Sequence, residues 1–354
     1  MSVLDVDLAI VGAGLSGLTA ALRFAHARVT EVPLRIAVIE AKDAIGGRTL
    51  STSNGIDLGG AWLWPHDSRA LALAADLHVE TLPQPGGSDG EARVQGGMSR
   101  LVAAVEHAIR ALPHVQLRVC LSTVAESVKI DNAGVVVTAD NLVLRAQHVL
   151  VALPPRLAAH SLSLPIDEGR REAMLRQPIW MGAMGKVGVE FAKPWWRSSP
   201  RFNINTAFLP GSAIKQMLDA SSDTAYAIVA FVVPPDDAGA MPALVDSVVR
   251  DLGALQRRVS GSEDAAIAVV SHSWRHDPFV FAPGPGSPFE HPRDGRDALR
   301  APLRDECGRA RVFFAGSETD GFAPGYLDGA VRAGERAAVE IGLELNAAAA
   351  TVSD

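Results

Sequence analysis

The chain has 354 residues, of which 48% are hydrophobic and 21% are charged, a balance that is typical of a globular protein with a sizeable core. Its net charge of −7 at pH 7 argues against a nucleic-acid-binding surface, which would be basic. The two cysteines, Cys120 and Cys307, have no metal-binding or CxxC spacing, so we expect a reduced protein without disulfides. The histidines are scattered, and we expect no metal site.

The sequence predicts a soluble cytoplasmic protein. No secretory signal precedes the first expected strand, and no apolar run approaches the roughly 20 residues that span a bilayer. The last stretch, residues 346–354, is too short and too polar for a membrane anchor. We therefore expect a small-molecule substrate and no membrane or nucleic-acid partner, and we leave a homo-oligomer open.

A dinucleotide-binding motif opens the chain. Residues 8–11 predict a short buried strand, a glycine-rich turn follows, and residues 18–25 predict a helix. In the turn, Gly12 allows a tight bend, Gly14 lets the backbone approach a pyrophosphate, and Gly17 lets the helix pack on the strand. The helix N-terminus then offers free N–H groups and the positive end of its dipole to the phosphates. The alternative is a glycine turn without a ligand.

The next strand and the turn after it favour FAD over NAD. The apolar strand at residues 35–39 ends at Glu40, which lies 23 residues after Gly17, where a carboxylate can bind ribose hydroxyls. Two glycines and Arg48 follow, and the arginine can neutralise a pyrophosphate. The two-glycine step recurs at residues 59–60. Asp57, just before it, is predicted to be a turn and helix-contact residue, not a catalytic acid.

The chain is predicted to be an α/β protein with two domains. A discontinuous dinucleotide-binding domain comprises residues 1–64, 93–155 and 295–354. A smaller α+β substrate domain with a mixed sheet comprises residues 65–92 and 156–294. The elements expected in the first domain are a helix at 98–112, strands at 115–119, 127–130, 135–138, 148–152 and 312–315, a hairpin turn at 131–134, and a helix from about Tyr326.

The expected substrate domain combines strands with one amphipathic helix. The helix at 241–259 has an apolar face, formed by Val245, Val248, Val249, Leu252 and Leu255. The other elements expected here are strands at 186–191, 225–233 and 265–271 and a loop rich in proline and glycine at 282–288.

Several motifs together resemble the flavin amine oxidase family of the monoamine oxidase type. The resemblance runs from near residue 6 to near residue 340, and it implies an FAD-binding Rossmann-like domain of the glutathione-reductase type. In the family, a long stretch of helices separates the two-glycine step at residues 59–60 from the helix that begins with Gly-Gly-Met at residues 96–98. In this chain only residues 62–95 separate them. The substrate domain is therefore shortened, and its cavity is either open or closed by another subunit. The matching motifs are residues 6–18, 46–48, 57–61, 149–155, 182–186, 313–319 and 325–338.

The resemblance implies two catalytic residues. Lys186 matches the lysine that holds a water near flavin N5, although the strand pattern alone puts it in solvent, on one face with Gly188 and Glu190. Tyr326 matches one half of an aromatic pair that aligns the amine before the flavin. The N–H groups of Tyr326 and Leu327, at a helix start, would point at flavin N1 and O2.

Other matches concern the cofactor and the substrate pocket. Ser317 is placed to bond the ribityl chain, and Val124 either meets the adenine or is an ordinary core valine. Because no cysteine lies at the flavin-linking position, we expect non-covalent FAD. The residues expected to bind FAD are Gly12, Gly14, Ser16, Gly17, Glu40, Ala41, Gly47, Arg48, Gly59, Gly60, Ala61, Trp62, Val124, Gly316, Ser317, Tyr326 and Leu327.

The second aromatic of the pair is missing from its expected place. Trp274 matches the tryptophan that precedes it, and Phe281 is the nearest candidate to replace it. Trp62 and Trp64 either line the substrate pocket or pack the shortened domain.

The resemblance favours an FAD-dependent oxidase that takes hydride from an amine and is reoxidised by O2 to give H2O2. The alternatives are another flavin oxidoreductase on the same scaffold, such as a dehydrogenase or desaturase with a different acceptor, and a flavin-binding protein without turnover.

Overall fold

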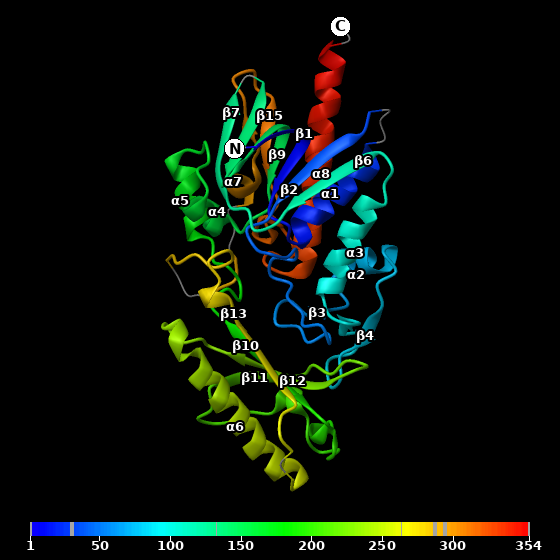
Figure 1. Cartoon of the computed structure of the whole chain (residues 1–354), viewed down its shortest axis with the longest axis vertical. Helices are drawn as coiled ribbons and strands as arrows, with labels where there is room; N and C mark the ends of the chain where they lie inside the picture. The colour runs from blue at the N-terminus through cyan, green and yellow to red at the C-terminus, as the bar shows by residue number, and fades with distance from the viewer. Residues whose placement is uncertain are drawn as a thin grey trace.

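The computed structural model describes residues 2–28, 32–131, 133–262, 264–285, 289–292 and 296–352. The chain forms two lobes, one built on a mainly parallel sheet and the other on an antiparallel sheet with one long helix (Figure 1). Among the described residues, no helix is both long and apolar enough to cross a membrane. Parts of three expected features lie outside the described residues, namely Asn132 of the hairpin turn, residues 286–288 of the loop and residues 353–354 of the C-terminal stretch.

Five parallel strands form the centre of the larger sheet, in the order β15-β9-β1-β2-β6. The short β14 pairs antiparallel with β15 at one edge, and the hairpin β7–β8 pairs with the first half of β9. The expected Rossmann-like sheet is thus confirmed, but two of its strands begin six residues before the predicted starts: β1 begins at Ser2 and not at Leu8, and β9 begins at Leu142 and not at His148. The strands are β1 (Ser2–Val11), β2 (Leu34–Ile39), β6 (Val115–Cys120), β7 (Ala125–Asp131), β8 (Gly134–Ala139), β9 (Leu142–Val151), β14 (Leu303–Arg304) and β15 (Ala310–Phe314).

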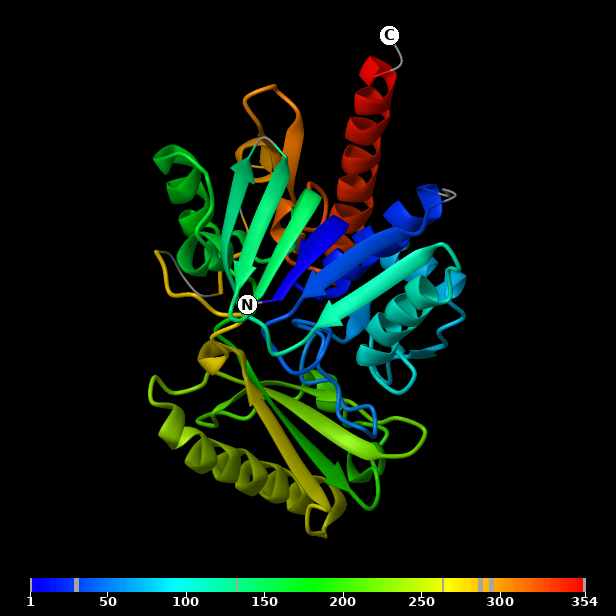
Figure 2. The ribbon, with the colours of Figure 1, turned by 45° about the horizontal axis from the view of Figure 1, so that its top comes forward.

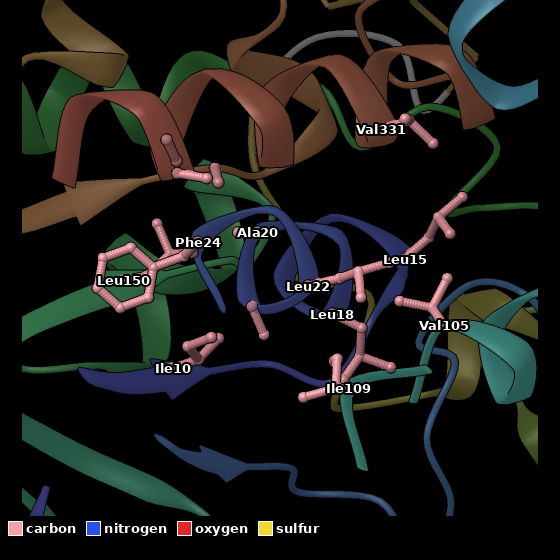
Figure 3. Packing of buried hydrophobic residues seen from close by; sticks show 14 of the residues in the cluster. Ile10, Leu15, Leu18, Ala20, Leu22, Phe24, Val105, Ile109, Leu150 and Val331 are labelled. Carbon is pink, nitrogen blue, oxygen red and sulfur yellow. The ribbon is translucent and has the colours of Figure 1, made fainter. Parts of the chain in front are cut away.

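Helices cover both faces of this sheet, which is why its central strands are apolar on both sides. Leu18, Phe24, Val105 and Val331 belong to one buried cluster, in which α1, α3 and α8 pack against the sheet (Figure 3). The helices α4, α5 and α7 cover the other face. The helices are α1 (Leu15–Ala27), α3 (Ser99–Arg110), α4 (Pro155–Ser161), α5 (Glu168–Arg176), α7 (Arg296–Arg300) and α8 (Leu327–Val352).

Gly17 provides the close contact between α1 and β1 that the motif predicts. A Cβ atom on Gly17 would lie 2.2 Å from the carbonyl oxygen of Gly12 and 3.1 Å from a methyl carbon of Ile10. Any larger residue would push the helix away from the strand, because backbone cannot yield in such a contact.

The second lobe is a four-stranded sheet in the order β11-β12-β10-β13. We expected a mixed sheet, and this is wrong: β10 lies between β12 and β13 and runs opposite to both, so every neighbouring pair is antiparallel. The expectation also missed β11, because Lys215 and Gln216 interrupt its apolar pattern at an irregular register. The strands are β10 (Gly185–Phe191), β11 (Ile214–Asp219), β12 (Tyr226–Val232) and β13 (Ala268–Ser273).

The long helix α6 (Met241–Ser260) packs along the outer face of this sheet (Figure 2). The predicted apolar face is confirmed: Val248, Leu252 and Leu255 are buried, and Val245 and Val249 pack beside them. The helix ends at Gly261, whose φ of 75° is left-handed, a conformation that favours glycine. Trp195 and Trp196 pack in the same core.

A third, small sheet joins the two lobes, in the order β3-β5-β4. Its strands are β3 (Trp62–Leu63), β4 (Thr81–Pro83) and β5 (Ala92–Val94). The expected domain limits fall just after β3, at residue 64, and within β5, at residue 93. Between β3 and β4, α2 (Ser68–Asp76) places Ala70, Leu73 and Ala74 in the core of the larger lobe. The short 3-10 helices are Trp195–Arg197, Ile204–Thr206, Ala238–Ala240, Trp274–His276 and Ser317–Thr319.

The packing of α6 predicts the effect of a core substitution. Leu252 is fully buried between α6 and the sheet, so Leu252→Ala should lower the free energy of unfolding by about 2–5 kcal/mol, measured by chemical denaturation. Arg250→Ala, at an exposed position of the same helix, is the matched control and should change it by less than about 0.5 kcal/mol. Equal effects of the two substitutions would contradict this packing.

Candidate functional site

A cavity of about 590 Å³ opens where the parallel strands of the larger sheet end. Because these strands run in one direction, the turns that follow them meet at one edge, where open α/β sheets bind their ligands. The turns after the strands therefore line one cavity. The lining residues from these turns are Gly12, Gly14, Glu40, Thr123, Val124, Ala152, Leu153, Gly316 and Ser317.

Two glycine-rich segments lie side by side at this edge. Gly46 forms a parallel bridge with Gly14 and donates its N–H to the carbonyl of Ala13 at 2.9 Å. A Cβ on Gly14 would meet only the carbonyl oxygen of Gly46, at 3.9 Å, so the backbone here is open to the cavity. Gly47 has a φ of 60°, which glycine adopts without strain. The pair forms a cradle that a phosphate group can approach closely.

Glu40 is held at the end of β2 by backbone N–H groups. One carboxylate oxygen accepts from Ala13 at 2.8 Å and the other from Lys42 at 3.0 Å. These bonds fix the side chain at the wall of the cavity, and each oxygen still has a second lone pair for a hydroxyl group.

The Arg48 guanidinium lies in the same cavity but is already paired. It donates to Glu318 at 2.7 Å and to the hydroxyl of Ser317 at 2.8 Å, and Glu318 is fully buried. The three side chains form a polar group next to the phosphate cradle. Arg48 can therefore meet an anion with a fixed orientation, since its ion pair with Glu318 immobilises the guanidinium.

Val124 and Ala41 line the cavity, beside the end of β2. The N–H of Val124 already donates to the carboxylate of Asp140 at 2.8 Å, so it is engaged within the protein. Tyr326 is similar: its N–H donates to the carbonyl of Ala323 at 3.1 Å. Leu327 begins α8, where the first N–H groups have no partner inside the helix and the dipole is positive.

Lys186 lies at the end of the cavity that borders the second lobe. Its side chain is 4% exposed, and the expectation from the strand pattern, that it lies in solvent, is wrong. Its Nζ donates to the carbonyl oxygens of Gly59 at 2.6 Å and Asp57 at 3.3 Å. The rings of Trp62 and Phe231 lie 4.5 and 4.8 Å from it. Elsewhere on this face of β10, Gly188 contacts Ile56 and Glu190 accepts a hydrogen bond from Asn54, while the other face packs on α6.

Burial lowers the pKa of Lys186, the charge of Asp57 opposes this shift and the charge of Arg93 adds to it, and together they bring the pKa to about 7. Burial likewise raises the pKa of Asp57 to about 6. Lys186 is thus partly neutral near neutral pH. A neutral amine donates its two N–H groups to the two carbonyls and keeps a lone pair that can accept a hydrogen bond or a proton.

Tyr326 lies within an aromatic group that the sequence only partly predicted. Its ring centre is 6.0 Å from that of Trp64, with the rings edge to face, and 6.1 Å from that of Trp180. His291 stacks on Trp180 at 3.5 Å and lies 5.6 Å from Tyr326. Trp180 and His291 carried no motif, so only the folded chain brings them to the tyrosine. Trp180 lines the cavity, as do Trp62, Trp64 and Tyr326.

The segment after Trp274 does not place Phe281 in the cavity. Trp274 itself lines the cavity and donates its indole N–H to the carbonyl of Leu58 at 2.9 Å. Phe279 and Val280 line it further along, and Phe281 is absent from the lining among the described residues. The second lobe adds residues that the sequence did not single out, namely Met184, Gln216, Leu218 and Phe231.

The residues present fit FAD. The glycine cradle gives close access to phosphate, Glu40 gives a carboxylate and Arg48 gives a cation, and all of them line the same cavity. Gly17 is the one expected FAD-binding residue outside the lining, because it packs α1 on β1. Among the described residues, there is no group of three or more histidine, cysteine, aspartate or glutamate side chains that could hold a metal ion.

Comparisons with known proteins identify the family of the chain. The family model described as flavin containing amine oxidoreductase matches residues 84–342, and the model of an NAD(P)-binding Rossmann-like domain matches residues 10–77. The chain is 29% identical over 231 residues to flavin-containing amine oxidase B of Rattus norvegicus, and 30% identical over 229 residues to that of Canis lupus familiaris. Each alignment covers 60% of this chain but only 41% of the relative's length.

Solved structures of amine oxidases share the fold. Cyclohexylamine oxidase from Brevibacterium oxydans superposes with a TM-score of 0.75 at 19% identity, over 97% of this chain and 100% of that chain. Putrescine oxidase bound to putrescine superposes with a TM-score of 0.73 at 20% identity, over 96% and 99%. The family model spans most of the chain, including Lys186 and Tyr326. The chain therefore belongs to the flavin-containing amine oxidoreductase family, and its cofactor is FAD.

Proposed function

We propose that the protein is an oxidase of a small-molecule amine, converting its C–N bond to an imine that water hydrolyses, with O2 as the electron acceptor and H2O2 as the second product. One observation carries this proposal: a lysine that is partly neutral near pH 7 lies at the end of a cavity of about 590 Å³, beside aromatic side chains. When bound, FAD supplies the acceptor, flavin N5, for the hydride from the carbon next to the amine nitrogen.

Lys186 of the second lobe and the aromatic side chains around the cavity would prepare the amine. Neutral Lys186 can accept a proton from a cationic amine, directly or through a water held on its lone pair. The rings of Tyr326, Trp64 and Trp62 would orient the amine by their faces, and the tryptophans and Phe231 exclude water from its apolar part. Trp62 is itself held in place, because its indole N–H donates to Gln84 at 2.9 Å.

The residues of the larger lobe would hold the cofactor without a covalent link. The glycines at 12–14 and 46–47 and the Arg48 guanidinium would bind the pyrophosphate, and Glu40 the ribose. Ser317 would bond the ribityl chain, and the start of α8 at Leu327 would stabilise negative charge on the reduced ring. We propose, accordingly, that the parallel sheet and its helices are the FAD-binding domain and the antiparallel sheet is the main part of the substrate domain.

Anaerobic mixing with amines tests the proposed reaction. Cyclohexylamine and putrescine, named for the two structural neighbours, are suitable first probes, together with other amines and amino acids. An amine substrate should bleach the visible flavin absorbance, and air should restore it with one H2O2 for each amine oxidised. Bleaching that air does not reverse would favour a dehydrogenase, and flavin that no amine or amino acid reduces would contradict amine oxidation.

The lack of a linking cysteine predicts free cofactor. Both cysteines lie away from the cavity lining, so acid precipitation of the purified yellow protein should release intact FAD into the supernatant. Absorbance and mass of the supernatant check this. Flavin that stays with the precipitate would show a covalent link.

Arg48→Ala should weaken FAD binding, because it removes a charge-assisted contact to the pyrophosphate worth about 1.5–3 kcal/mol. The dissociation constant, measured by titration of the flavin-free protein, should rise roughly 10–100-fold. Arg35→Ala is the control, because Arg35 lies in an exposed ion pair with Asp7. The thermal midpoint of each flavin-free variant separates lost binding from lost folding. An unchanged dissociation constant in Arg48→Ala would mean that the guanidinium does not meet the cofactor.

Lys186 predicts a specific pH dependence. Its pKa is lowered to about 7, so the side chain is mainly charged below that pH and mainly neutral above it. The charged form repels a cationic amine and cannot accept a proton, so kcat/KM should rise as the pH increases through about 7.

Lys186→Met should abolish this inflection and slow flavin reduction or reoxidation while FAD stays bound. Stopped-flow spectroscopy measures the two half-reactions separately. Because the amine substrate also titrates, the same amine is used for both proteins, and only the difference between their pH profiles is assigned to the lysine. Equal rates and equal profiles would remove Lys186 from the mechanism.

A further inference from the structure

The segment at residues 48–60 folds back on itself and covers the face of β10 that carries Lys186. Its two arms are joined by an antiparallel bridge between Ser51 and Asp57, and by hydrogen bonds from Leu58 to the carbonyl of Leu50 at 2.8 Å. Gly55, with a φ of 84°, forms the tip. This segment therefore acts as a short hairpin between the two lobes.

The hairpin contacts each residue on the lysine face of β10 in turn. Asn54 donates to the carboxylate of Glu190 at 2.6 Å. Ile56 fills the space above Gly188, where a Cβ would lie 2.9 Å from a methyl carbon of the isoleucine. The carbonyls of residues 57 and 59 receive Lys186. The place of the lysine amine therefore depends on where the hairpin is held.

Asp57 is the residue that holds the hairpin. One carboxylate oxygen accepts from the hydroxyl of Ser51 at 2.5 Å and from the N–H of Met98, at the start of α3, at 2.8 Å. Gly97 permits this approach, because a Cβ there would lie 2.6 Å from Ser51. The predicted helix contact of Asp57 is thus present. Its backbone carbonyl faces Lys186 while its side chain ties the hairpin to the larger lobe.

The second carboxylate oxygen of Asp57 takes no part in the hydrogen bonds that hold the hairpin. It is buried and has no hydrogen-bond partner among the described residues, and the Nε atom of Arg93 is in the same condition. A purely structural cap could be an asparagine or a serine, and a buried unpaired carboxylate oxygen is costly. The charged groups that act on Asp57 are Lys186 and Arg93, and those that act on Lys186 are Asp57 and Arg93. The three groups form one buried charge cluster.

We propose that Asp57 is a positioning residue that sets both the place and the charge state of Lys186. The proposal rests on the function proposed above for the lysine. Through its hydrogen bonds to Ser51 and Met98 the side chain fixes the two carbonyls that receive the amine. Through its negative charge it favours the charged form of the lysine, against burial and Arg93, and so keeps the amine close to its midpoint at neutral pH.

Lysine NMR on the FAD-loaded protein tests the proposal without turnover. The chain has five lysines, at positions 42, 129, 186, 193 and 215, so protein labelled with 13C at the lysine ε carbon gives few signals. Lys186→Met identifies the signal of Lys186. In the unsubstituted protein this signal should titrate with a midpoint near 7.

Asp57→Asn should lower the midpoint of the Lys186 signal by about one pH unit or more, because the amide oxygen can still accept both hydrogen bonds but the charge is gone. Glu190→Gln is the control: this carboxylate lies on the same strand face but does not act on the lysine charge, so the midpoint should stay unchanged. If Asp57 were only a structural cap, the Lys186 midpoint would be the same in the unsubstituted protein, in Asp57→Asn and in Glu190→Gln. A folded Asp57→Asn protein with an unchanged Lys186 midpoint would therefore overturn the proposal.

Ser51→Ala provides a milder variant if Asp57→Asn does not fold. It keeps the carboxylate but removes a hydrogen bond that favours its charged form, so the Lys186 midpoint should fall in the same direction by a smaller amount. An unchanged or raised midpoint in Ser51→Ala would then overturn the proposal. Because the titration needs no substrate, a protein that fails to oxidise amines but shows these shifts would contradict only the proposed function.

Discussion

The site depends on how the protein solvates one buried amine. Lys186 loses nearly all contact with water, and a buried ammonium is unfavourable without compensating groups. Two backbone carbonyls and two aromatic faces replace the water, and one carboxylate charge lies within electrostatic reach. This compensation is incomplete, which is why the pKa falls to about 7 and the amine can exchange a proton near neutral pH. A better solvated lysine would stay charged and could not act as a base.

The same constraint explains why the hairpin at residues 48–60 joins both halves of the site. Its first arm carries Arg48 beside the phosphate cradle, and its second arm carries the carbonyls that receive Lys186. The Gly60 N–H donates to the carbonyl of Arg48 at 3.0 Å, so the two arms are fixed to each other. Movement of this segment would therefore disturb the expected pyrophosphate contact and the lysine together. The proposed cofactor end and the proposed substrate end of the cavity therefore share one structural support.

The substrate end is built differently from the cofactor end. Parallel strands bring the turns that we propose to bind the cofactor to one edge of a sheet, whereas the aromatic group comes from separate loops around Tyr326. Trp180 and His291 stack on each other next to the tyrosine, so a second aromatic surface is present although Phe281 does not supply it. The shape of the pocket for the amine is thus set by loop packing, which differs more readily among relatives than a glycine turn.

The local sequence predicted the glycine-rich end of the cavity, where we propose that the cofactor binds. The glycine spacing, the strand before it and the acid after the next strand predicted the dinucleotide cradle, because each depends on backbone geometry within a few residues. The apolar face of α6 was equally visible, since helical periodicity is a local property. Only the tertiary structure decided the environment of Lys186: the strand pattern placed it in solvent, and a hairpin more than a hundred residues away covers it. Burial, hydrogen bonding to distant carbonyls and the resulting pKa arise from contacts between remote segments, which no local pattern contains.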